Sequence, residues 1–321
     1  MASLKDIKRH IVAVRQTQKL TKAMNMVAAA KLRATQSTTE HFQNYANEYA
    51  RLTAEIGRRS RILANNIIKP PVSPVKSLIV VYTSDRGLCG SFNSNIFNLT
   101  DRTILETRAK GLEPELFVLG KKGIEYYQRR NVTIHGRLPN LAQEFSYRFA
   151  SNLTSAFVEA HSADGRDEGG KAGGYKEISV IYTKFETVSR HYVTSAPFLP
   201  LADEAGPATG GPGGSVDAPG KKEKEKERKL DVSANVDYLV EPDAEALLKL
   251  LIPQSLTIKL YRAYLESVTS ENAARMQAMD NASKSCKDII SGLTLSYNKA
   301  RQSAVTNELL DIVNGAEALK G

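Results

Sequence analysis

The sequence predicts an α/β domain placed between two long helices that pair with each other as an antiparallel coiled coil. Both ends of the 321-residue chain repeat apolar residues at helical spacing and contain few helix-breaking residues. The middle of the chain alternates strand-like apolar runs with helix-like stretches. These observations together indicate one continuous architecture in which the two chain ends meet.

The N-terminal segment, residues 1–60, is predicted to form one unusually long helix. No proline or glycine occurs from Ala2 to Ile56, and Ser3 is a suitable N-cap. Apolar residues then repeat every three or four positions, at Leu4, Ile7, Ile11, Val14, Leu20, Met24, Val27 and Leu32. A helix of this length spans about 80 Å at 1.5 Å per residue. Because its apolar stripe is narrow, the helix needs a partner helix.

The C-terminal segment, residues 236–321, is the predicted partner. Pro242 and Asp243 are expected to start a helix, and Pro253 is expected to kink or restart it. Gly315 suits a C-cap, and alanines along the apolar ridge allow a close approach of the two helices. Because the two segments have matching lengths, we expect the first half of the N-terminal helix beside the last third of the C-terminal helix.

Residues 76–201 are predicted to form a Rossmann-like α/β domain with a mainly parallel sheet. Its strand-like runs are nearly continuous in apolar residues, which is typical of a sheet covered on both faces. The expected strands are 77–83, 115–120, 131–136 and 177–185. The expected helices lie near 92–109, 121–130 and 142–161.

Two further segments have compositions that do not favour packed structure. Residues 162–176 form a Gly-rich loop. Residues 202–231 pass from a Pro/Gly-rich stretch into alternating Lys and Glu, a composition that cannot bury a core. We interpret 202–231 as a solvated insertion that is either disordered or spread on the surface.

The composition argues against several classes of protein. With 41% hydrophobic and 25% charged residues, the chain is of the soluble globular type, and no apolar run is long enough to cross a bilayer. No leader pattern opens the sequence, so no export signal is expected. Two cysteines, Cys89 and Cys286, cannot form a disulfide framework, and no Cys/His cluster predicts a metal site. A reducing, cytosol-like compartment fits this pattern.

The net charge of +9 is concentrated at the N-terminus. Residues 1–37 hold one acid, Asp6, against the basic residues Lys5, Lys8, Arg9, Arg15, Lys19, Lys22, Lys31 and Arg33. Such a field attracts nucleic acid, anionic lipid or an acidic protein. Residues 1–41 contain no aromatic side chain, so nucleic acid would be bound through its phosphates alone. A basic coiled-coil protein that binds nucleic acid is therefore an alternative function.

The stretch TSDRGLCGSFN, residues 83–93, lies between a predicted strand and a predicted helix. Its context allows a phosphate cradle, a nucleophilic site at Cys89 or a tight turn. The stretch lacks the third glycine of a dinucleotide motif and the Gly-Lys-Ser/Thr ending of a P-loop, and no histidine is near in sequence. The favoured interpretation is a tight strand-to-helix turn with a small, half-buried cysteine.

Five motifs, in this order, resemble one protein family. DIKRHIVAVRQTQKLTKAMNMVAAAKLR, residues 6–33, is similar to the first helix of the gamma subunit of F-type ATP synthases. TSDRGLCGSFN (83–93), YLVEPD (238–243), ENAARMQAMDNAS (271–283) and LSYNKARQSAVTNELLDIVNGA (295–316) resemble the other motifs of that family. The resemblance covers the chain except for 202–231 and parts of 162–176.

The resemblance implies a non-catalytic rotor subunit without a cofactor, because catalysis in this family resides on beta. The two terminal helices would form a shaft inside the hexamer of alpha and beta subunits, with one copy per complex. The α/β domain would meet epsilon and the membrane ring of c subunits, and proton or sodium flow would turn the shaft. The expected location is peripheral, on the cytoplasmic face of a bacterial inner membrane or, alternatively, at an organellar inner or thylakoid membrane.

The resemblance also implies roles for individual residues. Contacts between the rotor and beta are expected at Lys19, Lys22, Met24, Met26, Arg86, Cys89, Arg275, Arg301, Gln302, Thr306 and Glu308. Contacts with the c ring are expected at Tyr238 and Glu241. The 83–93 loop would then be a mechanical contact, and no catalytic, cofactor-binding or metal-binding residue is expected.

The 202–231 insertion departs from one known variant of the family. Chloroplast members carry a redox-active cysteine pair in extra sequence of this general region. Residues 202–231 contain no cysteine, which excludes a thiol switch of that kind.

Overall fold

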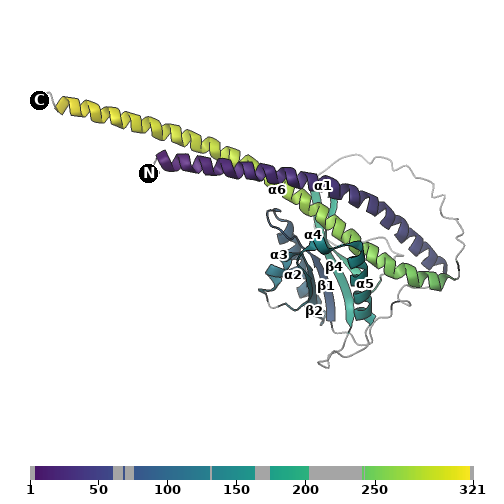
Figure 1. Ribbon diagram of the computed structural model, residues 1–321. Helices are drawn as coiled ribbons and strands as arrows, with labels where there is room; N and C mark the ends of the chain where they lie inside the picture. The colour runs from purple at the N-terminus through teal and green to yellow at the C-terminus, as the bar shows by residue number, and fades with distance from the viewer. Residues whose placement is uncertain are drawn as a thin grey trace, which may run out of the picture.

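The protein combines a long pair of helices with an α/β domain that packs mainly against the C-terminal one (Figure 1). The computed structural model describes residues 4–60, 68, 76–130, 132–162, 174–201, 241 and 243–318. The N-terminal helix α1 spans Leu4–Ser60 and the C-terminal helix α6 spans Ala244–Ala318. The fold class predicted from the sequence is confirmed.

Helices α1 and α6 run antiparallel, and we call the pair the shaft. The side chain of Gln18 donates to the carbonyl of Ser283 at 3.4 Å, and Asn25 Nδ2 donates to the carbonyl of Met276 at 2.8 Å. Residue numbers therefore fall along α6 as they rise along α1. Small buried side chains, among them Ala28 of α1, allow the close approach of the two helices.

The expected register of the shaft is wrong. The first half of α1 lies beside the middle of α6, at Met276 and Ser283, and not beside its last third. The helices have 57 and 75 residues, so the final turns of α6 extend alone past the N-terminal end of α1 (Figure 1). Periodicity could not reveal this offset because apolar residues continue along α6 to its end.

Helix α6 continues through Pro253, which was predicted to kink or restart it, and through Gly315, which was predicted to cap its end. Asp243 caps its start, since Oδ1 accepts the N–H of Ala246 at 2.7 Å. Pro253 and Gly315 both lie inside the helix rather than at a break or a cap. Proline removes one helical hydrogen bond. The flanking side chains of Ile252 and Leu256 are buried in the domain core, and this packing holds the helix on both sides of the proline.

The domain contains a five-stranded sheet with the order β3-β2-β1-β4-β5. Strands β1 to β4 pair in parallel, and β5 pairs antiparallel with β4 at the edge. The bounds are Lys76–Tyr82 for β1, Glu113–Leu119 for β2, Ile134–Leu138 for β3, Tyr175–Thr187 for β4 and Arg190–Leu199 for β5. Strand β5 was not among the predicted strands, because this edge strand mixes polar with apolar side chains.

Helices cover both faces of the sheet. Leu78, Val80 and Tyr82 of β1 pack with α5 and with the first half of α6, whereas Ile79 and Val81 pack with α2 and α3. The bounds are Phe92–Ala109 for α2, Lys121–Tyr127 for α3, Leu141–Glu144 for α4 and Tyr147–Ser162 for α5. The single helix predicted at 142–161 is therefore divided into α4 and α5. Helix α6 is both a covering layer of the sheet and half of the shaft.

Several predicted features lie outside the described residues. They are the 202–231 insertion, most of the 162–176 loop and Tyr238. Within the part of the chain that the structure describes, no helix combines the length and the hydropathy needed to span a membrane.

The register of the shaft is testable by crosslinking. With Cys89 and Cys286 replaced by serine, the pair Gln18→Cys and Ser283→Cys should crosslink within one chain through a short bis-maleimide, because these positions touch. The crosslinked chain is detected as a shift in mobility on a denaturing gel. The pair Gln18→Cys and Thr306→Cys is the matched control and should not crosslink. Crosslinking of Gln18→Cys with Thr306→Cys, and not with Ser283→Cys, would instead support the register in which the first half of α1 lies beside the last third of α6.

Candidate functional site

The loop that follows β1, residues 83–91, lies where the α/β domain meets α6. Gly90 has a φ of +60°, and a Cβ at this position would lie 3.6 Å from the Cβ of Ala278 on α6. Leu88 also has a positive φ, +63°, and its side chain is 60% exposed. Non-glycine residues adopt this left-handed conformation at a cost of roughly 1–2 kcal/mol. The surrounding contacts must therefore hold the loop in place.

Asp85 ties this loop to two helices of the domain. Its carboxylate accepts the N–H of Lys121 at the start of α3 at 3.3 Å. It also accepts the N–H groups of Leu141 and Ala142 at the start of α4, at 3.2 and 3.1 Å. A carboxylate at a helix N-terminus accepts hydrogen bonds from unpaired backbone N–H groups and is attracted to the positive end of the helix dipole. Asp85 thus serves as a cap shared by α3 and α4.

Cys89 lies beneath the loop, with only 3% of its surface exposed. Its Sγ accepts a hydrogen bond from Asn93 Nδ2 at 3.3 Å and lies near Ser84 Oγ and the Arg86 carbonyl. Burial raises the pKa of the Cys89 thiol, partly opposed by the hydrogen bond with Ser84. A raised pKa disfavours the thiolate, so this environment does not activate a nucleophile. Loop residues cover the sulfur in this conformation, and the expected contact of Cys89 with beta stays a prediction.

The loop is closed on itself and does not form an open phosphate cradle. Asn93 Oδ1 accepts the N–H of Ser84 at 3.1 Å, and its Nδ2 donates to Ser84 Oγ at 2.7 Å. At the start of α2, the N–H of Phe92 donates to the Cys89 carbonyl at 3.2 Å. The backbone N–H groups of Ser84 and Phe92, at the two ends of the loop, are therefore bonded within the loop rather than directed at a ligand. The tight-turn interpretation explains this geometry best.

Arg275 of α6 holds the outer side of the loop. Its Nη2 donates to the carbonyl of Arg86 at 3.1 Å and lies 3.5 Å from that of Gly87. The same nitrogen donates to Glu271 Oε1 at 2.7 Å. Arg275 therefore contacts its own loop, and its expected contact with beta stays a prediction. Sequence reasoning missed Glu271 and Asp85, although Glu271 and Arg275 have the i,i+4 spacing of a helical ion pair.

The remaining predicted contact residues lie on the shaft in two separate groups. Lys19, Lys22 and Met26 are exposed near the middle of the shaft, and Met24 is half-buried. The second group is exposed on the part of α6 near its C-terminal end and consists of Arg301, Gln302, Thr306 and Glu308. Arg86 is exposed on the loop, and Glu241 is exposed just before α6. The structure therefore does not gather the predicted residues into one site.

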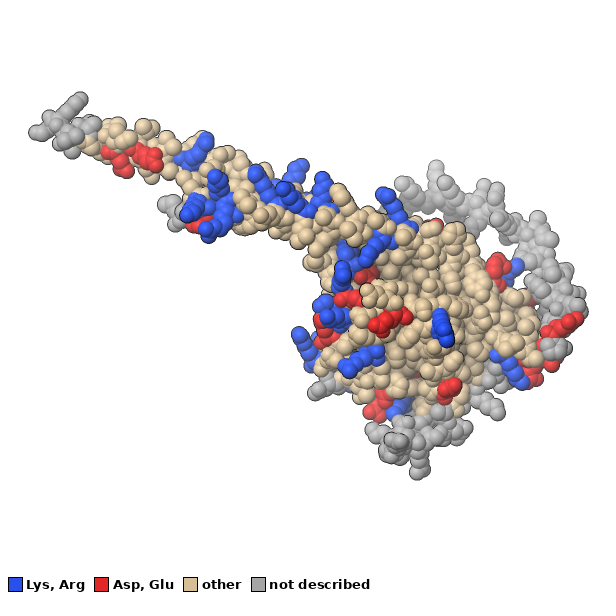
Figure 2. Space-filling view, in the orientation of Figure 1, with Lys and Arg blue, Asp and Glu red and all other residues tan. Residues whose placement is uncertain are grey.

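The surface of the shaft is charged along its length and apolar toward its free end. Figure 2 shows basic side chains gathered on the shaft beyond the domain, with acidic side chains near the free end. Large apolar side chains that remain exposed toward that end are Leu295, Val305, Leu309, Leu310, Ile312 and Val313. An exposed apolar surface of this kind marks a site of protein contact.

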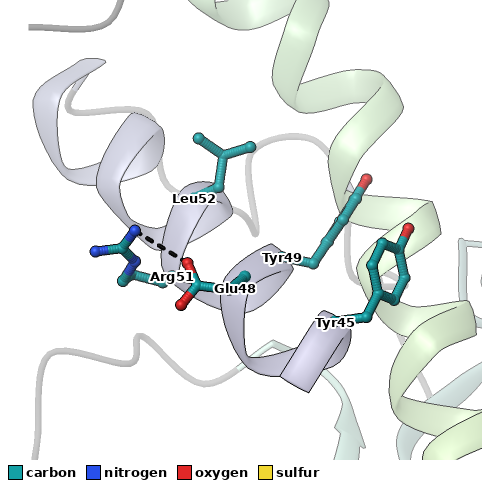
Figure 3. A pocket seen from close by; sticks show the side chains of 5 residues that line it. All are labelled: Tyr45, Glu48, Tyr49, Arg51 and Leu52. Carbon is teal, nitrogen blue, oxygen red and sulfur yellow. Dashed lines mark ion pairs between the residues drawn. The ribbon is translucent and has the colours of Figure 1, made fainter. Parts of the chain in front are cut away.

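A shallow hollow near the other end of α1 carries no catalytic arrangement. Tyr45, Glu48, Tyr49, Arg51 and Leu52 line it, and Glu48 pairs with Arg51 at 3.0 Å (Figure 3). Burial raises the pKa of Tyr49 to about 12, so its hydroxyl stays protonated at neutral pH. Among the described residues, no three His, Cys, Asp or Glu side chains gather as a metal site would require.

Comparison with protein families identifies one match across nearly the whole chain. The family model described as ATP synthase matches residues 3–319. The ATP synthase gamma chain of Syntrophobacter fumaroxidans is 37% identical over 321 residues, covering all of both chains. The gamma chain of Desulfosudis oleivorans is 38% identical over 323 residues, again covering all of both chains.

Comparison with solved structures gives the same architecture. A chain of the Tetrahymena thermophila mitochondrial ATP synthase central stalk and c-ring aligns with a TM-score of 0.55 and 26% identity. This alignment covers 82% of the present chain and 99% of the Tetrahymena chain. A chain from the Euglena gracilis mitochondrial ATP synthase aligns with a TM-score of 0.61 and 16% identity, and the alignment covers 98% of the present chain and 94% of the Euglena chain. The Euglena likeness concerns the fold alone.

The role of Asp85 as a shared cap predicts a loss of stability on substitution. Asp85→Ala should lower the free energy of unfolding by about 2 kcal/mol or more, because backbone donors of two helices lose a charged acceptor. Asp280→Ala is the matched control and should cost less than about 1 kcal/mol, since Asp280 makes an exposed ion pair with Lys284. Urea unfolding followed by circular dichroism measures both. Equal losses would contradict a special role for Asp85.

Proposed function

Because the chain belongs to the gamma-chain family of F-type ATP synthases, we propose that it is the rotating shaft that couples a membrane ring of c subunits to the beta catalytic sites. One structural observation carries this proposal. Helix α6 continues without a break from the core of the α/β domain into a projecting shaft, whose free end exposes large apolar side chains. Such a projection is suited to insertion into a collar of other subunits.

Torque would pass through α6 itself. The first half of this helix is packed on the sheet through Leu256 and Leu260, while its second half pairs with α1. Because no linker separates the two halves, rotation of the domain would turn the shaft with it. Stiff transmission of this kind needs a packed core on one side and a paired helix on the other.

The face that the shaft presents to each beta subunit would bias the conformation of that subunit. The two helices have different lengths and different surfaces, so a ring of identical subunits meets a different face at each position. A contact can shift a conformational equilibrium only through its differential affinity for the states. Rotation of an asymmetric shaft supplies that difference in turn to each beta subunit.

Basic residues on α1 would complement acidic surface on beta. Lys19 and Lys22 are exposed on the shaft, next to the exposed Met26. Complementary charge aligns two surfaces and suppresses wrong contacts while adding little affinity per pair. That combination suits a surface that must bind and release three partners during each turn.

We also propose that the chain is a non-catalytic component and that it contacts the c ring through residues that lie just before α6. The loop after β1 is closed by its own hydrogen bonds, and its buried thiol is not activated. Glu241 is exposed immediately before α6, and together with Tyr238 it would contact the c ring. Proton or sodium flow through that ring would drive rotation. The protein would then be peripheral, at the cytoplasmic face of the bacterial inner membrane.

Reconstitution tests the rotor function. Mixing the full chain with alpha and beta subunits of the same complex should give one assembly with a single copy of the chain, seen by native mass spectrometry. ATP hydrolysis should appear with alpha and beta present and be absent from the isolated chain. An isolated chain that hydrolyses ATP, or that retards RNA on a gel while ignoring alpha and beta, would contradict the proposal.

Charge reversal tests the proposed contact with beta. Lys19→Glu with Lys22→Glu should lower ATP-driven proton pumping relative to ATP hydrolysis by up to about thirtyfold, since two exposed pairs together contribute up to about 2 kcal/mol. The matched control is Arg129→Glu with Lys176→Glu, two exposed basic residues on the α/β domain. The control should leave the ratio unchanged. Equal losses in both variants would refute the charge argument.

A further inference from the structure

Helix α6 carries two acid–base pairs with low exposure, Arg262 with Glu266 and Glu271 with Arg275, and the second of these faces the 83–91 loop. Glu271 and Arg275 are paired at 2.7 Å, and their side chains are only 16% and 17% exposed. Asp280 and Lys284 have the same spacing about two and a half turns further on, but their side chains are 51% and 72% exposed. Exposed pairs of this type add little stability, whereas a buried pair is costly unless its geometry is well satisfied. The buried pair therefore needs an explanation beyond helix stability.

The pair is satisfied by the loop that it faces. Arg275 Nη2 reaches both Glu271 and the carbonyl of Arg86, and it lies close to the carbonyl of Gly87. Burial raises the pKa of Glu271, while the neighbouring Arg275 opposes this shift by favouring the charged carboxylate. The guanidinium thus links one carboxylate on α6 to backbone oxygens of the α/β domain.

The loop holds an exposed side chain on one side and a buried thiol on the other. Leu88 projects at 60% exposure from a left-handed backbone conformation. Cys89, the next residue, is covered and bonded to Asn93. Release of the loop from Arg275 would therefore move Leu88 and uncover Cys89 together.

We propose that Glu271 is a positioning residue that aims Arg275 at the carbonyl groups of Arg86 and Gly87, so that the pair clamps the 83–91 loop to the shaft and fixes the exposed Leu88. The proposal rests on the proposed function insofar as this loop is a surface that meets beta. The proposal adds to that function by identifying the two side chains that fix the position of the loop against α6. Glu271 itself need not touch another subunit.

The reactivity of Cys89 measures the clamp directly in the full chain. With Cys286→Ser, Cys89 is the remaining thiol, and its modification by an aromatic disulfide reagent reports opening of the loop. Glu271→Gln keeps the size of the side chain but removes its charge, and should speed modification about fivefold. Arg275→Gln should speed it about tenfold or more, and the double variant should match Arg275→Gln alone.

Two controls separate local release from general weakening. Asp280→Asn removes the charge from the exposed pair on the same helix and should leave the Cys89 rate unchanged. Arg275→Lys keeps the charge but not the planar fork, and it should also release the loop, which provides a second route if Glu271→Gln folds poorly. The urea midpoint is measured for every variant. An unchanged Cys89 rate in Glu271→Gln, or a rise explained entirely by a lower midpoint, would overturn the proposal.

The same variants in the reconstituted complex keep this proposal distinct from the rotor function. Faster modification of Cys89 combined with weaker coupling supports both. Faster modification with unchanged coupling supports the clamp and refutes the role of this loop at beta. Unchanged modification with weakened coupling refutes the clamp and leaves the rotor function standing.

Discussion

The burial of α6 against the sheet is the contact on which the rest of the molecule depends. Leu256 and Leu260 are fully buried there, and the hydroxyl of Tyr82 on β1 donates to the carbonyl of Leu260 at 3.0 Å. This face fixes where α6 lies and in which direction it leaves the domain. The position of α1 follows, since α1 pairs with α6, and the direction of the shaft follows from both.

Polar contacts fix the register that apolar packing leaves open. Alanine and leucine seams tolerate sliding, because neighbouring registers bury similar surfaces. The hydroxyls of Thr39 and Thr269 meet at 2.9 Å within the buried seam, and Asn25 bonds to a backbone carbonyl of α6. A one-turn slip would break these contacts between the helices, and a hydrogen bond contributes about 0.5–1.5 kcal/mol to stability. The shaft therefore has one preferred alignment.

Features that depend on local spacing were predicted well, and features that depend on tertiary contact were not. The two long helices, the parallel sheet and the turn after β1 follow from periodicity and glycine placement. The length mismatch of the shaft was missed because the apolar pattern of α6 continues beyond its partner. Pro253 lies in the helix because core packing outweighs its local effect. The burial of Cys89 and the clamp at Glu271 depend on α6, which is distant in sequence, so spacing within the loop could not reveal them.

The placement of charge along the molecule matches two mechanical demands. Exposed charges such as Lys19 and Lys22 would make weak, solvent-screened contacts in the proposed rotor, and such contacts would be broken and remade as partners change. The buried pair of Glu271 and Arg275 behaves differently, because separating two partly desolvated charges is costly. In the proposed rotor, the contacts that exchange would therefore be on the surface of the shaft, and the contact that persists would lie between the shaft and the domain. This division would let the shaft turn past its partners while the domain and the shaft stay joined.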